Sequence, residues 1–543
     1  MNRPRRYLFV MMHAGFVRNY ESTLRLLVRR GHRIHIVYEN DRNKLGENVV
    51  VERLAAELPE VTHGVAARRE DGLWSRAAYT ARTYMDFLRY LEPRYAKAVR
   101  LRDRVEQLVP RRLLQLARAA APAAAARRGL AAIARLIDRL APPSPAIAAF
   151  VRDLHPDALL VTPLVDVGSG QVDYLREAAI RGIPSALCVA SWDNLTNKGL
   201  MREIPHRVLL WNDRQKAEAV ELHGVPPERV RVTGAQIFDH WFTWRPARTR
   251  AEFCAMVGLD HRRPIILYVG SSFFIAPNEA DFAERWLTAI RASGDPEVAG
   301  ANVLIRPHPN NSMQWLGFDF QKFGGVALWP KFEADPFAPE FKHDLFDSLF
   351  HCAAVVGVNT SAQIEAAIVG RPVLTVRAPD FVHSQDGTLH FEHLADDDAG
   401  LLQIAATLDE HVEQLRQILA DPAPVEQRTR AFVHAFVRPH GLETPATPIL
   451  ADELEELAAL RVVPARAPWW TAAARQTMRA GLAITQPLWS TADARRRKEP
   501  VPPGFALVVP LLHLVANLQV TRMRAQIAVK RWREGERRQP SER

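Results

Sequence analysis

The chain has 543 residues, of which 48% are hydrophobic and 24% are charged. This length and balance are typical of a globular protein with two or three domains, and they exclude collagen-like, disulfide-scaffold and fully disordered chains. The three cysteines, Cys188, Cys254 and Cys352, form no CxxC pair, which argues against a zinc ribbon or redox motif and fits a reducing compartment.

The net charge of +10 is concentrated in two segments. Residues 94–139 contain twelve Lys or Arg against three Asp or Glu, and residues 472–543 contain fourteen against five. The remaining sequence is therefore mildly acidic. Because no basic groove studded with aromatic residues is visible, the pattern argues against nucleic acid as a partner.

The apolar runs are too short for a membrane span or a signal peptide. The longest run, 505–516, has twelve residues and contains Pro510 and His513, whereas a spanning helix needs about 20 apolar residues. Near the N-terminus, the stretch 7–12 follows three arginines but has only six residues and no small-residue cleavage site after it. We therefore expect 7–12 to be the first β-strand.

Strands and helices alternate along the first half of the chain. The hydrophobic spacing predicts strands at 7–12, 33–38, 158–161, 185–189, 207–211 and 229–233, with helices at 20–30, 171–181 and 214–223. Segment 73–141, rich in Ala, Leu and Arg, interrupts this rhythm and ends at Pro142-Pro143-Ser144-Pro145. We interpret it as a helical insertion.

The same alternation returns in the second half. The sequence predicts strands at 265–269, 302–305, 355–358 and 373–376, helices at 279–291 and 361–369, and helices throughout 398–436. Such alternation is typical of α/β folds with parallel sheets. We expect two Rossmann-like domains, 1–245 with a basic helical insertion at 73–145 and 246–440, followed by a basic helical tail at 441–543.

The strongest local signal for a site is Val358-Asn359-Thr360-Ser361-Ala362-Gln363-Ile364-Glu365. A buried strand ends here and a helix begins, which leaves backbone N–H groups that suit a phosphate, with Asn359, Thr360 and Ser361 beside them. Glu365 lies one turn further on the same face, where its carboxylate can accept hydrogen bonds from a ribose. The alternative is that Thr360 or Ser361 only caps the helix and Glu365 is a solvated acid.

Two further loops follow strands of the second domain. Arg306-Pro307-His308-Pro309 comes after 302–305, and Ser271 and Ser272 come after 265–269. Loops beyond the carboxyl ends of parallel strands form the ligand crevice of open α/β sheets, so Arg306 and His308 are expected to meet a diphosphate there. The alternative for Arg306 and His308 is a rigid proline turn with surface charges.

Three residues of the first domain are candidates for a general base. His13 directly follows the first predicted strand, Asp166 lies in the loop after 158–161, and Asp193 lies in Ser191-Trp192-Asp193-Asn194. Imidazole and carboxylate groups are the usual proton acceptors in catalysis. For each of the three, a purely structural role is the alternative.

Three stretches resemble the GT-B glycosyltransferase superfamily, nearest to the CDP-glycerol glycerophosphotransferase-like and UDP-N-acetylglucosamine 2-epimerase-like proteins. They are RVRVTGAQIFDHW at 229–241, LIRPHP at 304–309 and GVNTSAQIEAAIVGRPVLTV at 357–376, and the resemblance extends over about residues 1–445. It implies two Rossmann-like domains that face a central cleft.

The resemblance also implies roles for single residues. Glu365 is similar to the acid that holds the donor ribose, Thr360 and Ser361 to the diphosphate contacts, and Arg306 and His308 to the basic phosphate contacts. His13 occupies the place of a catalytic histidine in some inverting members. Two features depart from the family: the loop HAGFVRN lacks a Gly-rich run, and the glutamate pair of retaining members is absent, since Gly357 and Val373 stand where it would fall.

These features together predict an inverting, metal-independent transferase of surface-polysaccharide synthesis that needs no cofactor. Its donor would be a nucleotide-sugar or CDP-polyol, and its acceptor a glycan or lipid-linked molecule. The alternatives are a nucleotide-sugar 2-epimerase, against which the two basic segments argue, and a non-catalytic nucleotide-sugar-binding protein.

The basic segments also suggest a location. Segments 105–140 and 505–533 place leucines and isoleucines among arginines, as in interfacial helices with basic flanks. We therefore expect a cytoplasmic protein held peripherally on the inner, anionic face of a membrane. The alternative is that 105–140 covers the first domain and its arginines are simply solvated.

Overall fold

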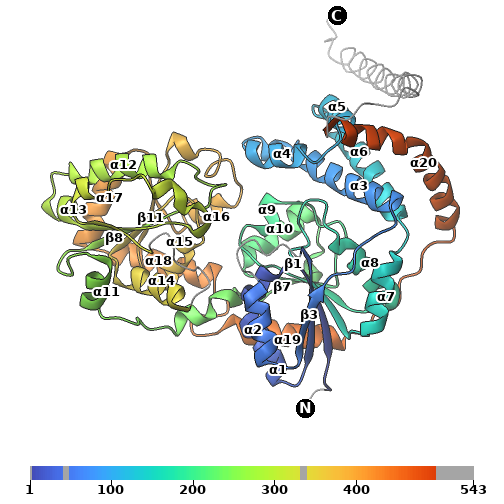
Figure 1. Cartoon of the computed structure of the whole chain (residues 1–543), viewed down its shortest axis with the longest axis horizontal. Coiled ribbons are helices and arrows are strands. Elements are labelled where there is room, and N and C mark those ends of the chain that lie inside the picture. Colours follow the sequence, from blue (N-terminus) through green and yellow to red (C-terminus); the bar gives the residue numbers. More distant parts are fainter. Residues whose placement is uncertain (1–2, 41–47, 331–338, 497–543) are drawn as a thin grey trace, which may run out of the picture. The chain divides into compact units, whose positions relative to one another are not determined.

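The computed structural model describes residues 3–40, 48–330 and 339–496 (Figure 1). The chain divides into two compact units, 1–478 and 479–543. The first unit contains both β-sheets and all the residues of the candidate site. Within the described ranges, we find no helix with the length and apolarity that crossing a membrane requires.

The first sheet has seven parallel strands in the order β3-β2-β1-β4-β5-β6-β7. The strands are β1 Arg6–His13, β2 Arg33–Asn40, β3 Val61–Val65, β4 Ala158–Thr162, β5 Ser185–Cys188, β6 Arg207–Leu210 and β7 Val230–Val232. Every residue of β4 and β5 is buried, as expected for strands with both faces covered. The connecting helices are α1 Glu21–Arg29, α2 Asn48–Glu57, α7 Pro145–Leu154, α8 Gln171–Arg181, α9 Asn194–Asn197 and α10 Asp213–His223.

A group of helices is inserted between β3 and α7. These helices are α3 Leu73–Arg89, α4 Val99–Glu106, α5 Arg111–Ala120 and α6 Ala124–Leu140. They share an apolar cluster of their own, and buried ion pairs link them to the first sheet, since Arg82 of α3 contacts Asp138 of α6 and Asp173 of α8 at 2.7 Å each. The insertion is therefore tied to the sheet by hydrogen-bonded charges as well as by packing.

The second sheet has six parallel strands in the order β10-β9-β8-β11-β12-β13. The strands are β8 Ile265–Val269, β9 Asn302–Arg306, β10 Val326–Leu328, β11 Ala354–Gly357, β12 Val373–Val376 and β13 Gln403–Ala405. Its helices are α11 Arg250–Val257, α12 Glu279–Arg291, α13 Pro296–Gly300, α14 Pro339–His351, α15 Ala362–Ile368, α16 Phe391–Ala395, α17 Leu408–Ala420 and α18 Ala423–Phe436. After them come α19 Ala446–Ala459 and α20 Thr471–Arg496.

The two parallel sheets confirm the predicted α/β class with two Rossmann-like halves. One expectation was wrong: the range 398–436 is not helical throughout, because Gln403–Ala405 forms β13, which pairs with β12. The structure also has α2, β3 and β10, which sequence analysis did not predict. Strands β3, β10 and β13 are short, and each lies at the edge of its sheet, where incomplete burial leaves little apolar pattern.

Two predictions are not tested by this architecture. The proposed domain boundaries at 245 and 440 stay predictions, since the first compact unit extends to Met478. The apolar and basic stretch 505–533 lies outside the described residues.

Candidate functional site

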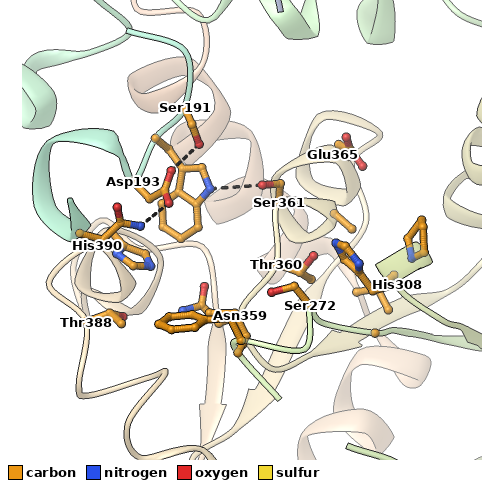
Figure 2. Close-up of a pocket in the computed structure, with 18 of the residues that line it drawn as sticks. Ser191, Asp193, Ser272, His308, Asn359, Thr360, Ser361, Glu365, Thr388 and His390 are labelled. Atoms are coloured by element: carbon orange, nitrogen blue, oxygen red, sulfur yellow. Dashed lines mark hydrogen bonds between the residues drawn. The ribbon is translucent and has the colours of Figure 1, made fainter. Parts of the chain in front are cut away.

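A cavity of about 530 Å³ lies within the first unit, where loops that follow β8, β9 and β11 meet residues of the first half of the chain (Figure 2). Because the carboxyl ends of parallel strands share one edge of a sheet, three loops far apart in sequence converge there. Eight of the predicted site residues line the cavity: Asp193, Ser272, Arg306, His308, Asn359, Thr360, Ser361 and Glu365.

Three predicted site residues, Ser271, His13 and Asp166, are not among the described residues that line this cavity. Ser271 is fully buried, and its backbone N–H donates to the Glu279 carboxyl group at 2.8 Å. This contact holds the loop after β8 in place without facing the cavity. His13 ends β1 and packs against Phe16, with the two rings tilted by 50° and their centroids 4.6 Å apart. The roles predicted for His13 and Asp166 as bases therefore gain no support from the geometry.

Glu365 faces the cavity from α15 (Figure 2). Burial raises the pKa of its carboxyl to about 7, although the charges of Arg18 and Arg306 oppose this shift. The carboxyl group is consequently poised between its neutral and ionised forms near neutral pH. In the ionised form it accepts hydrogen bonds from a pair of hydroxyl groups.

Arg306 is buried at the end of β9 with only 4% of its surface exposed. Its Nη1 donates to Ser348 Oγ at 3.1 Å, its Nη2 donates to the Phe341 carbonyl oxygen at 3.3 Å, and its guanidinium lies 5.0 Å from the centre of the Phe341 ring. Among the described residues, no carboxylate forms an ion pair with it. Burial lowers the pKa of Arg306 to about 10, although the charges of Asp344 and Glu365 oppose this shift, so the guanidinium remains charged at neutral pH.

His308 presents a defined nitrogen to a ligand. Its Nδ1 accepts a hydrogen bond from the Asn310 backbone N–H at 3.2 Å, so the neutral ring carries its proton on Nε2. Burial lowers the pKa of His308, which favours this neutral form. The adjacent loop approaches closely, since a Cβ on Gly270 would lie 3.0 Å from the His308 backbone nitrogen. Glycine at 270 thus permits the β8 and β9 loops to touch.

The turn at 359–361 is partly occupied by internal hydrogen bonds. Asn359 Nδ2 donates to the Ser384 carbonyl oxygen at 2.6 Å, and the Thr360 N–H donates to Gln363 Oε1 at 3.1 Å. Ser361 Oγ accepts from the indole N–H of Trp192 at 3.3 Å (Figure 2). The Asn359 amide and the Thr360 N–H are therefore already engaged, while the hydroxyl groups of Thr360 and Ser361 can still donate to a phosphate.

Asp193 lies on the first-half side of the cavity (Figure 2). It accepts hydrogen bonds from Ser191 Oγ at 2.5 Å and from Asn197 Nδ2. Burial alone would raise its pKa, but the charges of His390 and Lys198 and these hydrogen bonds hold the pKa below its usual value. Asp193 is therefore a carboxylate at neutral pH.

His390 lines the cavity next to Asp193. Burial lowers the pKa of its ring to about 4, although the charge of Asp193 opposes this, so the imidazole is neutral at pH 7. The ring packs edge-on against Trp192, with centroids 4.9 Å apart, and its Nδ1 lies 3.4 Å from Thr196 Oγ1.

The helical insertion holds the segment that carries Asp193. Arg89 of α3 is buried and donates to the carbonyl oxygens of Leu195 at 2.8 Å, Gly199 at 2.9 Å and Lys198 at 3.4 Å. The Lys198 carbonyl also accepts from the Tyr90 hydroxyl at 2.8 Å, and the Leu195 carbonyl lies 2.8 Å from His223 Nε2, so Arg89 belongs to a network of hydrogen bonds around this segment. The position of α9 and the following turn therefore depends on contacts with a helix about 100 residues earlier in the chain.

Sequence analysis missed several residues of the cavity wall. They include Arg18, Leu101, Arg104, Trp192, Lys198, Phe274 and His390. Three of these carried a usable signal, because Arg18, Trp192 and Phe274 lie shortly after the carboxyl ends of β1, β5 and β8. Arg104 and Lys198 carried none, since only the packing of α4 against α9 brings them to the cavity. In the described part of the chain, no group of three His, Cys, Asp or Glu side chains is arranged to hold a metal ion.

Comparison with known proteins finds similarity in structure but none in sequence. No family model matches the chain, and no curated protein matches it in sequence. It is similar in structure to the UDP-GlcNAc 2-epimerase of Neisseria meningitidis solved with UDP-GlcNAc, with 12% identity, a TM-score of 0.46, and coverage of 83% of this chain and 100% of that one.

It is likewise similar to a glycosyltransferase of Rickettsia africae, with 9% identity, a TM-score of 0.46, and coverage of 84% of this chain and 100% of that one. The calicheamicin glycosyltransferase CalG4 gives 15% identity and a TM-score of 0.44, with coverage of 84% and 98%. At this distance the likeness concerns the fold alone, and the chemistry of the site has to be argued from its own residues.

Proposed function

We propose that this protein is an enzyme that binds a nucleotide-activated sugar or polyol in the cavity and transfers the activated group to an acceptor hydroxyl. One observation supports this proposal more strongly than any other. Arg306 is a buried, charged guanidinium without a carboxylate partner among the described residues, and it shares its cavity with Glu365 and His308. A buried cation of this kind requires an anion for charge compensation.

The donor would be held by the second-sheet side of the cavity. Arg306, His308 Nε2–H and the hydroxyl groups of Thr360 and Ser361 are all donors, which matches the oxygens of a diphosphate. Glu365, lying nearby and ionising near pH 7, is suited to accept hydrogen bonds from ribose hydroxyl groups. The same donors stabilise the negative charge that develops on the departing phosphate.

The acceptor would approach from the first-half side. Among the three predicted bases, Asp193 is the one that lines the cavity, and it is ionised at neutral pH. Its carboxylate takes the proton of the acceptor hydroxyl while that oxygen forms a bond to the anomeric carbon of the sugar. The bond from this carbon to the leaving phosphate breaks, and a nucleoside diphosphate departs with the electron pair. A CDP-polyol would react instead at phosphorus and release a nucleoside monophosphate.

The proposal is tested first by nucleotide binding. Thermal unfolding with UDP, CDP, GDP and CMP should reveal one base that raises the midpoint, because a ligand that binds only the folded state stabilises it. The matching nucleotide-sugar is then incubated with and without candidate acceptors. Release of nucleotide only when an acceptor is present supports a transferase. Conversion of the sugar without an acceptor would favour the 2-epimerase alternative, and binding without any turnover would favour a binding protein.

We also propose that the enzyme works at the cytoplasmic, anionic face of a membrane. In the helical insertion Leu108, Leu116, Ile133 and Leu136 are exposed among arginines, whereas Leu114 and Leu140 pack inward. Exposed apolar side chains with basic neighbours suit reversible binding to anionic lipid.

Flotation with anionic and neutral vesicles tests this location. We expect recovery with anionic vesicles that falls with added salt and that falls several-fold in Ile133→Ser/Leu136→Ser. Val49→Ser removes an apolar side chain of similar exposure, 52%, from a different surface and serves as the control. Equal recovery with both lipids, or none, would contradict the proposal.

A further inference from the structure

Two cations that line the cavity from the first half of the chain, Arg104 and Lys198, are not explained by the proposed donor site. Arg104 belongs to α4 of the helical insertion, and Lys198 follows α9. Among the described residues, neither side chain forms an ion pair with a carboxylate. Both line the same cavity as Asp193, and the charge of Lys198 helps to lower the pKa of that carboxyl.

The guanidinium of Arg104 is fixed in place. Its Nη2 donates to the Asn197 carbonyl oxygen at 2.5 Å, and its central carbon lies 5.4 Å from the centre of the Phe274 ring. Arg100, one turn earlier on α4, reaches the Phe274 carbonyl oxygen at 3.3 Å. A guanidinium has five N–H donors, and contacts within the described chain engage only one of those on Arg104. The remaining donors are available to a ligand without a large loss of side-chain entropy.

The charges of the cavity fall into two groups. Near Glu365, the charges of Arg18 and Arg306 both act on that carboxyl, and a bound diphosphate would compensate them. In the second group, Arg104 and Lys198 line the same cavity as the single carboxylate Asp193, the charge of Lys198 acts on that carboxylate, and His390 is neutral at pH 7. An acceptor that offered only an uncharged hydroxyl group would leave this second group with excess positive charge in a partly enclosed cavity.

We propose that Arg104 and Lys198 form an anion subsite that holds a phosphate or carboxylate of the acceptor while the acceptor hydroxyl faces Asp193. This inference rests on the proposed function, because it assigns the second substrate of the same cavity. It makes the acceptor an anionic molecule, such as a polyol phosphate or a sugar acid, and it gives the helical insertion a part in choosing that acceptor.

Calorimetric titration tests the subsite without knowledge of the natural acceptor. The full chain is first saturated with the nucleoside diphosphate that stabilises it most, so that the donor side is filled. Glycerol 3-phosphate, glycerate and glycerol are then titrated as probes. We expect the phosphate, the carboxylate or both to bind, and we expect no binding of glycerol. The two anionic probes distinguish a phosphate acceptor from a carboxylate acceptor.

Substitutions locate the bound anion. Lys198→Gln and Arg104→Gln should each weaken binding of the anionic probe by about tenfold or more, the loss typical of a hydrogen bond between charged groups. Nucleotide affinity should stay within about twofold of the wild type, which also shows that the variants are folded. Arg112→Gln removes the same charge from an exposed position on α5 and should change neither measurement. Arg306→Gln should give the opposite result: it should weaken binding of the nucleotide and leave binding of the anionic probe unchanged.

The possible failures are distinguishable. If the wild type binds no nucleotide, the proposed function is wrong, and the subsite fails with it as an acceptor site. If nucleotide binds but no anionic probe does, or if Lys198→Gln and Arg104→Gln bind the probe as tightly as Arg112→Gln, the anion subsite is wrong while the proposed function stands.

Discussion

On the second-sheet side of the cavity, Arg306 is the last residue of β9, and Glu365 lies on α15, the helix that follows β11. On the first-half side, Asp193 and Lys198 lie in a turn whose carbonyl groups are held by Arg89 of a distant helix. The first arrangement is local in sequence, whereas the second depends on tertiary contacts. The side proposed for the donor is therefore built from strands and loops of the second sheet, and the side proposed for the acceptor is held in place by the helical insertion.

Replacing Asp193 should produce the largest effect and separate the two sides most clearly. Asp193→Asn should lower the rate of transfer by about 10²–10⁴-fold, the usual contribution of a general base. Nucleotide affinity should change little, because the donor contacts lie across the cavity. Initial rates and calorimetric titration measure the two quantities. A variant that retains more than about a tenth of the wild-type rate would return the role of base to His13 or Asp166.

Replacing Arg306 should weaken binding of the donor nucleotide without affecting the acceptor side of the cavity. Arg306→Gln should weaken nucleoside diphosphate binding by about 10–100-fold, since a hydrogen bond to a charged group contributes about 1.5–3 kcal/mol. The thermal midpoint without ligand shows separately how far the loss of the hydrogen bonds to Ser348 and Phe341 destabilises the fold. Arg285→Gln, on the exposed face of α12, is the matched control. Equal nucleotide affinity in both variants would refute the role assigned to Arg306.

Replacing Arg89 should disturb the acceptor side from outside the cavity. Arg89→Gln removes hydrogen bonds to three carbonyl groups, so the free energy of unfolding should fall by about 2–3 kcal/mol. Transfer should fall by about tenfold through misplacement of Asp193, with nucleotide affinity preserved, and Arg89→Lys should recover part of the rate. Arg94→Gln, at an exposed site nearby, should have no such effect. A parallel loss of nucleotide affinity would contradict the separation of the two sides.

The smallest expected effect is on pH dependence. Because the pKa of Glu365 lies near 7 in the empty protein, the carboxyl is mostly protonated at pH 6 and mostly ionised at pH 8. Only the ionised form accepts two ribose hydrogen bonds, so affinity for a nucleotide-sugar should rise over this range, by less than about tenfold. Glu365→Gln should flatten the profile. A flat profile in the wild type would show that Glu365 does not contact the ribose.

The difference between the two sides also explains which parts of the fold and of the site could be predicted from the sequence. Strand, loop and helix patterns are local, so the two parallel sheets and the donor-side residues Arg306, His308 and Glu365 were predictable from their spacing. The strands β3 and β13 were not, because short strands with little apolar alternation resemble loops. On the acceptor side, three candidates for the base looked alike in sequence, and only Asp193 reaches the cavity.

Arg104 and Lys198 illustrate why the other cavity residues could not be predicted from the sequence. In sequence, Arg104 is one of twelve basic residues in 94–139, and nothing in its neighbourhood distinguishes it from solvated arginines. Its place in the cavity wall follows from a hydrogen bond to Asn197 and a contact with Phe274, which lie 93 and 170 residues away. Contacts between residues so far apart in the chain produce no periodic pattern in the sequence.

The hydrogen bond from Trp192 to Ser361 has an optical consequence. The indole belongs to the turn that carries Asp193, while the hydroxyl belongs to the proposed phosphate contacts, so the bond joins the two sides of the cavity. A phosphate that draws on the Ser361 hydroxyl alters the polarity around the indole N–H, and the fluorescence of an indole responds to its surroundings. Trp192 is in this sense a built-in reporter, whose emission would register the arrival of the donor without any added label.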